Sequence, residues 1–169
     1  MSTPARWIRL DAEGKAALRA AVAGFAQAQS EYSAPAALWG RAGEGERLLD
    51  SNCERELTLA LVAPFKFAPG HPQRWCAWAL TPLVAAWRAA GLRAYLEGDG
   101  VFLSGRRVAA GEASAIGACV VVISSVAAAE GAFLDELRRR IASQHGWQFD
   151  HSWPSAAEKE AMLEQADAA

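Results

Sequence analysis

The sequence predicts a single-domain α/β fold, in which a mixed β-sheet is flanked by helices. Segments with strand periodicity alternate with helical segments, in the order helix, strands, helix, strands, helix, helix. The chain has 169 residues, of which 52% are hydrophobic, so it can bury a core without disulfides or a structural metal. Because we find no internal repeat and no linker, we expect residues 1–169 to form one domain.

The first half of the chain predicts one helix and two strands. Helical periodicity begins after Asp11, a candidate N-cap, and continues to about Gln29. A short strand is expected at residues 36–39, and a second at 57–62, where leucines alternate with smaller residues. A flexible glycine loop at residues 40–46 follows the first of these strands.

The second half predicts three more strands and three helices. A helix is expected at residues 73–90, ended by the C-cap Gly91 and kinked or broken near Thr81 by Pro82. Strands follow at 93–96, 100–103 and 116–124. A helix at 127–145 ends at Gly146, and a capping box at Ser155–Glu158 begins the last helix.

The tryptophan content is high, at seven residues, and three of them share the predicted helix at 73–90. Trp87 lies on the same helical face as Leu80 and Leu83, which makes it a core candidate. Trp75 and Trp78 point elsewhere on the helix. A packing or subunit surface is a more common use of such a pair than a ligand site, and the sequence does not decide the role.

Composition and charge exclude several classes of function. A net charge of −2 and a pI near 5.9 argue against nucleic-acid binding. No apolar run is long enough to span a membrane, and the N-terminal residues lack the apolar segment of a signal peptide. The three cysteines form no C-x-x-C pair, which favours the reducing cytoplasm. The three histidines have no zinc-ligand spacing, so we expect no metal site within the protein itself.

Residues 91–125 carry the most informative pattern. A strand leads into Gly98-Asp99, a second short strand into Ser104-Gly105-Arg106-Arg107, and an apolar strand follows. This order resembles the catalytic module of the biotin/lipoate–protein ligases, in which an Asn-Asp pair precedes a strand and a Gly-Arg-Lys turn follows it. The glycine loop, the strand after it and the closing segment from Gly146 extend the resemblance to the lipoate-ligase branch, over about residues 36–165.

The resemblance implies an acyl-adenylate-dependent ligase or acyltransferase that uses ATP and magnesium. Its expected partners are a small-molecule acid, lipoate-like rather than biotin-like, and an acyl-carrier domain whose lysine receives the acyl group. It also implies a site: Arg107 replaces the catalytic lysine that stabilises negative charge. The implied ligand-binding residues are Arg41, Gly43, Gly45, Asp99 and Arg106, with the loop residues at the phosphate and Asp99 at the pocket floor.

Several residues depart from the family pattern. Glu44 adds a carboxylate to a loop expected to hold phosphate, and Gly98 stands in place of the asparagine. The planar guanidinium of Arg107 does not reproduce the geometry of an ammonium. The sequence therefore leaves open an enzyme, a non-catalytic member of the same fold that binds a small ligand or a protein, and an unrelated α/β domain with similar turns. Ordinary turn chemistry also accounts for Asp99 and for the glycine loop.

A thiol mechanism is a further alternative for an acyltransferase. The octanoyl-transfer relatives of this family use a cysteine. Cys53 lies just before a strand near the glycine loop, and Cys76 is expected on the inner side of a helix. Neither matches a family position, so both remain unassigned.

Overall fold

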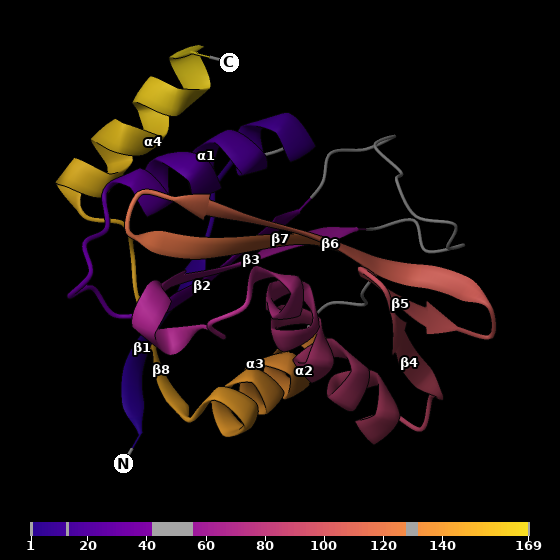
Figure 1. Cartoon of the computed structure of the whole chain (residues 1–169). Coiled ribbons are helices and arrows are strands. Elements are labelled where there is room, and N and C mark those ends of the chain that lie inside the picture. The colour runs from indigo at the N-terminus through magenta and orange to yellow at the C-terminus, as the bar shows by residue number, and fades with distance from the viewer. Residues whose placement is uncertain (1, 13, 42–55, 128–131, 169) are drawn as a thin grey trace.

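The computed structural model describes residues 2–12, 14–41, 56–127 and 132–168 (Figure 1). An eight-stranded mixed sheet has the order β4-β5-β6-β7-β3-β2-β1-β8. Its strands are β1 (Thr3–Arg9), β2 (Ala36–Arg41), β3 (Leu57–Pro64), β4 (Ala94–Glu97), β5 (Gly100–Leu103), β6 (Arg106–Ile116), β7 (Cys119–Val126) and β8 (Trp147–His151). The helices are α1 (Lys15–Gln27), α2 (Trp75–Ala89), α3 (Ala132–His145) and α4 (Ala156–Ala168), with short 3₁₀ turns at Phe65–Phe67 and Pro72–Arg74. The predicted α/β class is confirmed.

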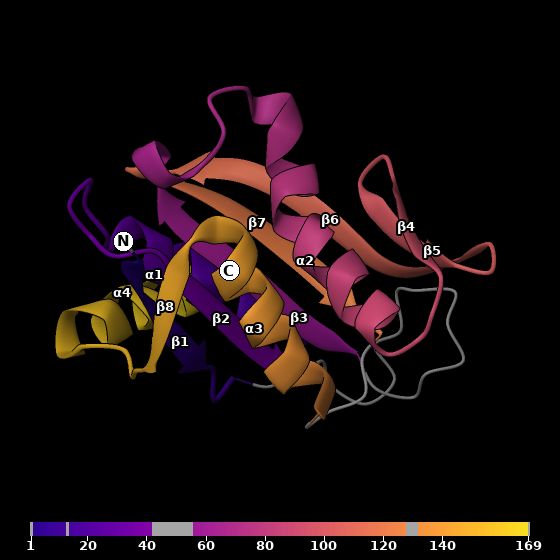
Figure 2. The same ribbon diagram turned by 90° about the horizontal axis from the view of Figure 1, so that it is seen from below.

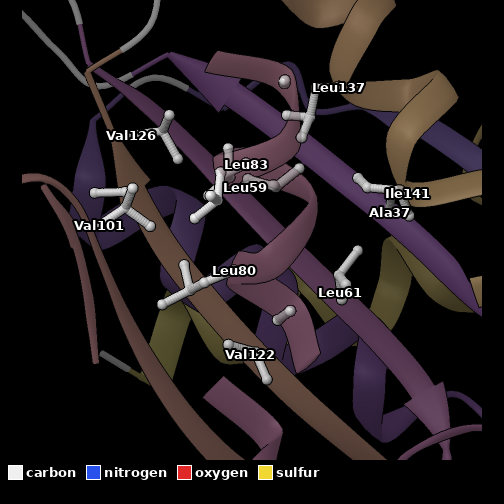
Figure 3. Close-up of a cluster of buried hydrophobic side chains, with 14 of the residues drawn as sticks. Ala37, Leu59, Leu61, Leu80, Leu83, Val101, Val122, Val126, Leu137 and Ile141 are labelled. Carbon is white, nitrogen blue, oxygen red and sulfur yellow. The ribbon is translucent and has the colours of Figure 1, made fainter. Parts of the chain in front are cut away.

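β3 lies at the centre of the sheet and is buried along its whole length. Alternate side chains of a strand point to opposite faces, so β3 contributes to two cores. Leu59 and Leu61 pack under α2 and α3, together with Leu83 and Ile141 (Figure 3). Ala60 and Val62 belong to the core under α1 instead. A strand buried on both faces explains the almost continuous apolar run in this part of the sequence.

The helices cover the two faces of the sheet in pairs. α1 packs beside α4 on one face, and α2 packs beside α3 on the other. Figure 2, seen from below, shows α2 and α3 crossing the near face. No helix among the described residues is long and apolar enough to cross a membrane.

The tryptophan-rich helix forms as one continuous element. α2 runs through Pro82 without a break, and Gly91 adopts φ +85° after it as the predicted cap. Trp87 is 5% exposed, which confirms its place in the core. The prediction that Trp75 points away from the core is wrong, because it is 9% exposed and its indole N–H donates to the Pro69 carbonyl over 2.8 Å. Trp78 packs against His145, with ring centroids 4.9 Å apart.

The structure corrects the predicted strands near the middle of the chain. The strand expected at 116–124 is the second arm of a long hairpin, in which β6 ends at Ile116 and β7 begins at Cys119. Gly117 makes the turn with φ +57°. β6 escaped the sequence analysis because its middle, from Ala109 to Ala115, has no β-branched or aromatic side chain of the kind that marks strands. Strands 57–62, 100–103 and 116–124 do lie in one sheet, as predicted.

The ends of the domain also differ from prediction. β1 and β8 were not predicted, although they pair in parallel from Thr3↔Trp147 to Trp7↔His151. α1 begins at Lys15 after Gly14, so Asp11 does not cap it. The described part of α3 begins at Ala132, and Ala127 follows directly on β7 instead of beginning this helix.

A buried ion pair joins α4 to β1. Nη1 of Arg6 lies 2.7 Å from one oxygen of Glu158, and Nη2 lies 2.9 Å from the other. Gln29 donates to Glu158 over 2.6 Å. The predicted capping box is present, because the Ser155 N–H donates to Glu158 and the Glu158 N–H donates to the Ser155 hydroxyl. Burial raises the pKa of Glu158, but these hydrogen bonds and the charge of Arg6 outweigh it and lower the pKa to about 2.

Replacing this carboxylate should destabilise the fold. Glu158→Gln leaves the guanidinium of Arg6 without its counter-charge, and we expect a loss of about 2 kcal/mol in the free energy of unfolding. Denaturant unfolding at pH 7 measures it. Glu160→Gln, an exposed neighbour on α4, is the matched control and should change stability by less than about 0.5 kcal/mol.

The same pair predicts a pH dependence. The pKa of Glu158 falls from 4.5 to about 2 on folding, so its stabilisation is present above pH 4.5 and is lost as the pH falls toward 2. Glu158→Gln should flatten this loss. An acid-unfolding curve of the variant that parallels the native curve between pH 4.5 and 2 would contradict the assignment.

Candidate ligand-binding site

Arg106 and Arg107 begin β6 directly after a two-residue turn. Ser104 and Gly105 have φ values of +52° and +78°, which suit the twist of a tight hairpin. Arg106 pairs with Leu103, and Arg107 pairs with Phe102. The turn thus presents two adjacent arginines whose side chains alternate between the faces of the sheet.

The side chain of Arg107 lies over Gly100. A Cβ added to Gly100 would be 3.3 Å from Cδ of Arg107 and 3.3 Å from a ring carbon of Phe102. The ring of Phe102 also stacks on Tyr95, with centroids 5.7 Å apart. Val101, which alternates with Gly100, is fully buried in the core that includes α2. Arg107 therefore lies on the face away from α2, beside an aromatic pair.

A row of small residues crosses the sheet on the face of Arg107. Successive strand pairings align them from β2 to β5: Gly40, Thr58, Ser125, Ala110 and Gly100. The row begins beneath α1, where a Cβ on Gly40 would overlap the side chain of Leu18. At its other end the row is covered, because Gly100 is buried beneath the side chains of Arg107 and Phe102.

An ion pair connects α1 to β6 beside this row. Arg19 Nη2 lies 2.7 Å from a carboxylate oxygen of Glu112. The side chains are 40% and 68% exposed, so water screens the pair and it contributes little to stability. Its importance is electrostatic, because it compensates the negative charge of Glu112 on the face that carries Arg107.

Asp99 is placed toward α2. It forms the predicted β4–β5 hairpin turn with Gly98, and its backbone carbonyl accepts from the Gly111 N–H over 2.8 Å. Its carboxylate lies close enough to Cys76, at the start of α2, to act on the ionisation of that thiol. Burial, and next the negative charge of Asp99, raise the pKa of Cys76 to about 11. The thiol of Cys76 is therefore neutral at pH 7.

The structure does not bring Arg41 beside Arg107. Arg41 ends β2 and pairs with Leu57, and the same row continues through Val126 to Ala109 on β6. Three strand spacings make about 14 Å, and this row belongs to the face of α2 and α3. Gly43, Gly45 and Cys53 lie outside the described residues, so the convergence of the glycine loop with Arg107 stays a prediction.

Sequence reasoning missed the small-residue row and the ion pair of Glu112. The missed signal was the stretch from Ala109 to Ala115, in which every side chain except that of Glu112 is small. The row can be recognised only once the register of β6 is known, because the residues that align with Ala110 come from four other strands.

Solved structures share this architecture, although no family model and no curated relative matches the sequence. A bipartite lipoate–protein ligase from Thermoplasma acidophilum has a TM-score of 0.79 at 10% identity, covering 98% of this chain and 92% of that one. Lipoate–protein ligase A bound with ATP has a TM-score of 0.74 at 9% identity, with coverages of 97% and 94%. The Helicobacter pylori biotin acetyl-coenzyme A carboxylase synthetase with biotinylated ATP has a TM-score of 0.56 at 12% identity, with coverages of 98% and 83%.

The fold is that of the biotin/lipoate ligase catalytic module. The likeness spans nearly the whole chain, including β1 and β8, and it confirms the resemblance inferred from residues 91–125 at the level of fold. The sequence identity is only about one residue in ten, so the likeness shows a shared fold. It does not show a shared reaction.

The described cysteines should react slowly if they are structural. Burial raises the pKa of Cys119 to about 11, like that of Cys76, so at pH 8 about one thiol in a thousand is ionised. Iodoacetamide labelling of the native chain at pH 8, mapped by mass spectrometry, should be at least about a hundredfold slower at both than in the unfolded chain.

Asp99→Asn provides an internal comparison. It removes a charge that raises the pKa of Cys76, so labelling should quicken there and stay unchanged at Cys119. Fast labelling of native Cys76 at pH 8 would instead support the thiol mechanism.

Proposed function

We propose that this chain is a divergent ligase-like protein that binds a small carboxylic acid, or its adenylate, on the face of β5 and β6 that carries Arg107. The observation that supports this is the placement of Arg107. It follows the turn at which the resemblance implies a charge-stabilising cation, in a chain with the ligase-type fold. The neighbouring structures that contain ATP, biotinylated ATP or lipoic acid show what proteins with this fold bind.

The described residues fit an anionic ligand. Arg107 supplies a permanently charged guanidinium that pairs with carboxylate or phosphate. Gly100 lets the side chain of Arg107 lie close against β5, because an added Cβ would be 3.3 Å from Cδ of Arg107 and 3.3 Å from the ring of Phe102. The Arg19–Glu112 pair keeps the nearby carboxylate from repelling the ligand.

ATP with magnesium would supply the activation of the acid. The described residues contain no cluster of three His, Cys, Asp or Glu that could hold a metal. This agrees with a magnesium ion that is carried mainly by phosphates and water, as is usual for nucleotide sites. Among the described residues, Arg107 would pair with the phosphate of the nucleotide.

We infer binding with slow acyl transfer, or none, to the lysine of a carrier domain. Arg107 lacks the ammonium geometry of the family lysine, and Gly98 stands in place of the family asparagine. The competing candidate is an active lipoate- or biotin-type ligase, favoured by the near-complete match to the ligase fold. The two differ in pyrophosphate release.

Thermal unfolding with ATP, lipoate and biotin, singly and as acid plus ATP and magnesium, tests the proposal. A ligand at about a hundred times its Kd should stabilise by about 2.7 kcal/mol, which raises the melting temperature by several degrees. Arg107→Ala should remove the shift. Arg139→Ala, which removes a 70% exposed arginine of α3 on the other face, should keep it.

Pyrophosphate release separates the two candidates. We expect a melting shift with slow or undetectable release. Rapid release that requires both acid and ATP would establish the active ligase, and the absence of a shift with every ligand would sink the binding site itself.

A further inference from the structure

A cavity of about 600 Å³ opens between α1, α4 and the C-terminal end of β1. Ala17 and Ala21 line it, whereas Arg19, about half a turn away, faces β6. Neither Arg107 nor Gly100 contributes to the lining, so the cavity is separate from the site proposed above. Its volume lies within the range of small-molecule sites.

The cavity arises where two helices diverge. α1 and α4 touch at Gly24, where an added Cβ would lie 2.5 Å from the backbone of Ala161 and of Met162. From this contact α4 rises away from α1 toward its C-terminus (Figure 1), and the alanines of α1 leave the space unfilled. The cavity between the two helices is therefore wedge-shaped, and the contact at Gly24 lies at its narrow end.

At the base of the wedge, within the described part of the chain, β1 is paired on one side only. β1 pairs with β2 as far as Arg9, but its pairing with β8 ends at Trp7↔His151. The chain then turns through Pro154 into α4. Among the described residues, no strand therefore pairs with Arg9 on the β8 side of β1, and Arg9 lines the cavity.

The lining combines an apolar body with positive charge. Leu10, Trp39 and Met162 form apolar walls, and the rim carries Trp153 and Leu163, which are 78% and 66% exposed. Large apolar side chains this exposed mark binding surfaces when they adjoin a cavity.

The charges of the lining favour an anion. Among the described residues of the lining, Arg9 and Lys159 contribute cations and Asp11 contributes a carboxylate. The guanidinium of Arg9 lies 5.3 Å from the ring centroid of Trp39, which places the charge directly beside the apolar wall. His151 is engaged with Arg138 over 2.9 Å.

We propose that this cavity binds a small amphipathic monoanion, with an apolar body against the tryptophan and leucine walls and one anionic group at Arg9 and Lys159. The wedge supplies apolar contact and the rim supplies charge complementarity, which together define that ligand class. This second site is independent of the proposed function at Arg107.

Paired fluorescent probes test both parts of the proposal. 8-Anilinonaphthalene-1-sulfonate carries an apolar ring system and one sulfonate, and N-phenyl-1-naphthylamine has the same rings without the charge. Titration at pH 7, read by energy transfer from tryptophan, should show one sulfonate probe per chain. The double variant Arg9→Gln/Lys159→Gln should weaken the sulfonate probe about tenfold and the neutral probe less than about twofold.

A cavity-filling variant tests the location. Ala17→Phe should block both probes, whereas Ala16→Phe, an exposed neighbour on α1 outside the lining, should leave both unchanged. Melting curves establish that each variant is folded. Two results would overturn the proposal: equal effects of the double variant on both probes, or unchanged binding in folded Ala17→Phe. A dimer that Ala17→Phe dissociates would also overturn it, because the cavity would then be an interface between two copies of the chain.

Discussion

The burial of β3 on both faces is the constraint on which the rest of this structure depends. A central strand whose every residue is buried requires a packed layer above and below the sheet. Pairing with β2 on one side and β7 on the other then fixes the register of the whole sheet. Through that register, small residues from five strands form a single row. Ala110 and Glu112 of β6 come to lie on the face that carries α1.

Both candidate sites lie where this two-layer packing stops. Of the described helices, α2 is the one that packs extensively on β4 and β5, so the other face of that hairpin carries Arg107 and Tyr95 near solvent. At the opposite edge of the sheet, β8 ends before β1, and α4 diverges from α1 beyond Gly24. In each case a glycine allows a close approach, because Gly100 lets the side chain of Arg107 lie against β5 and Gly24 lets α1 touch α4.

The sequence predicted the fold class, the helices and the turns at Gly98-Asp99 and Ser104-Gly105, because periodicity and turn residues are local signals. It did not predict the turn at Gly117. It missed β6, whose small side chains form a strand only when β5 and β7 pair with it. It also missed β1 and β8, which pair with each other although they lie at opposite ends of the sequence. Arg107 was named from a turn pattern alone. Gly100, Thr58 and Ser125 were not, because tertiary register brings them together and no local pattern marks them.

The most direct test of the central claim is to map a ligand onto the backbone amides by NMR. Lipoate with ATP and magnesium is added to the isotope-labelled chain, and the shift of each amide is followed. Ligand binding beside Arg107 predicts that the largest changes fall at Gly100, Arg107 and Ala110, with α3 unaffected. Changes confined to α3, or none at concentrations that raise the melting temperature, would contradict a binding site on the face of β5 and β6.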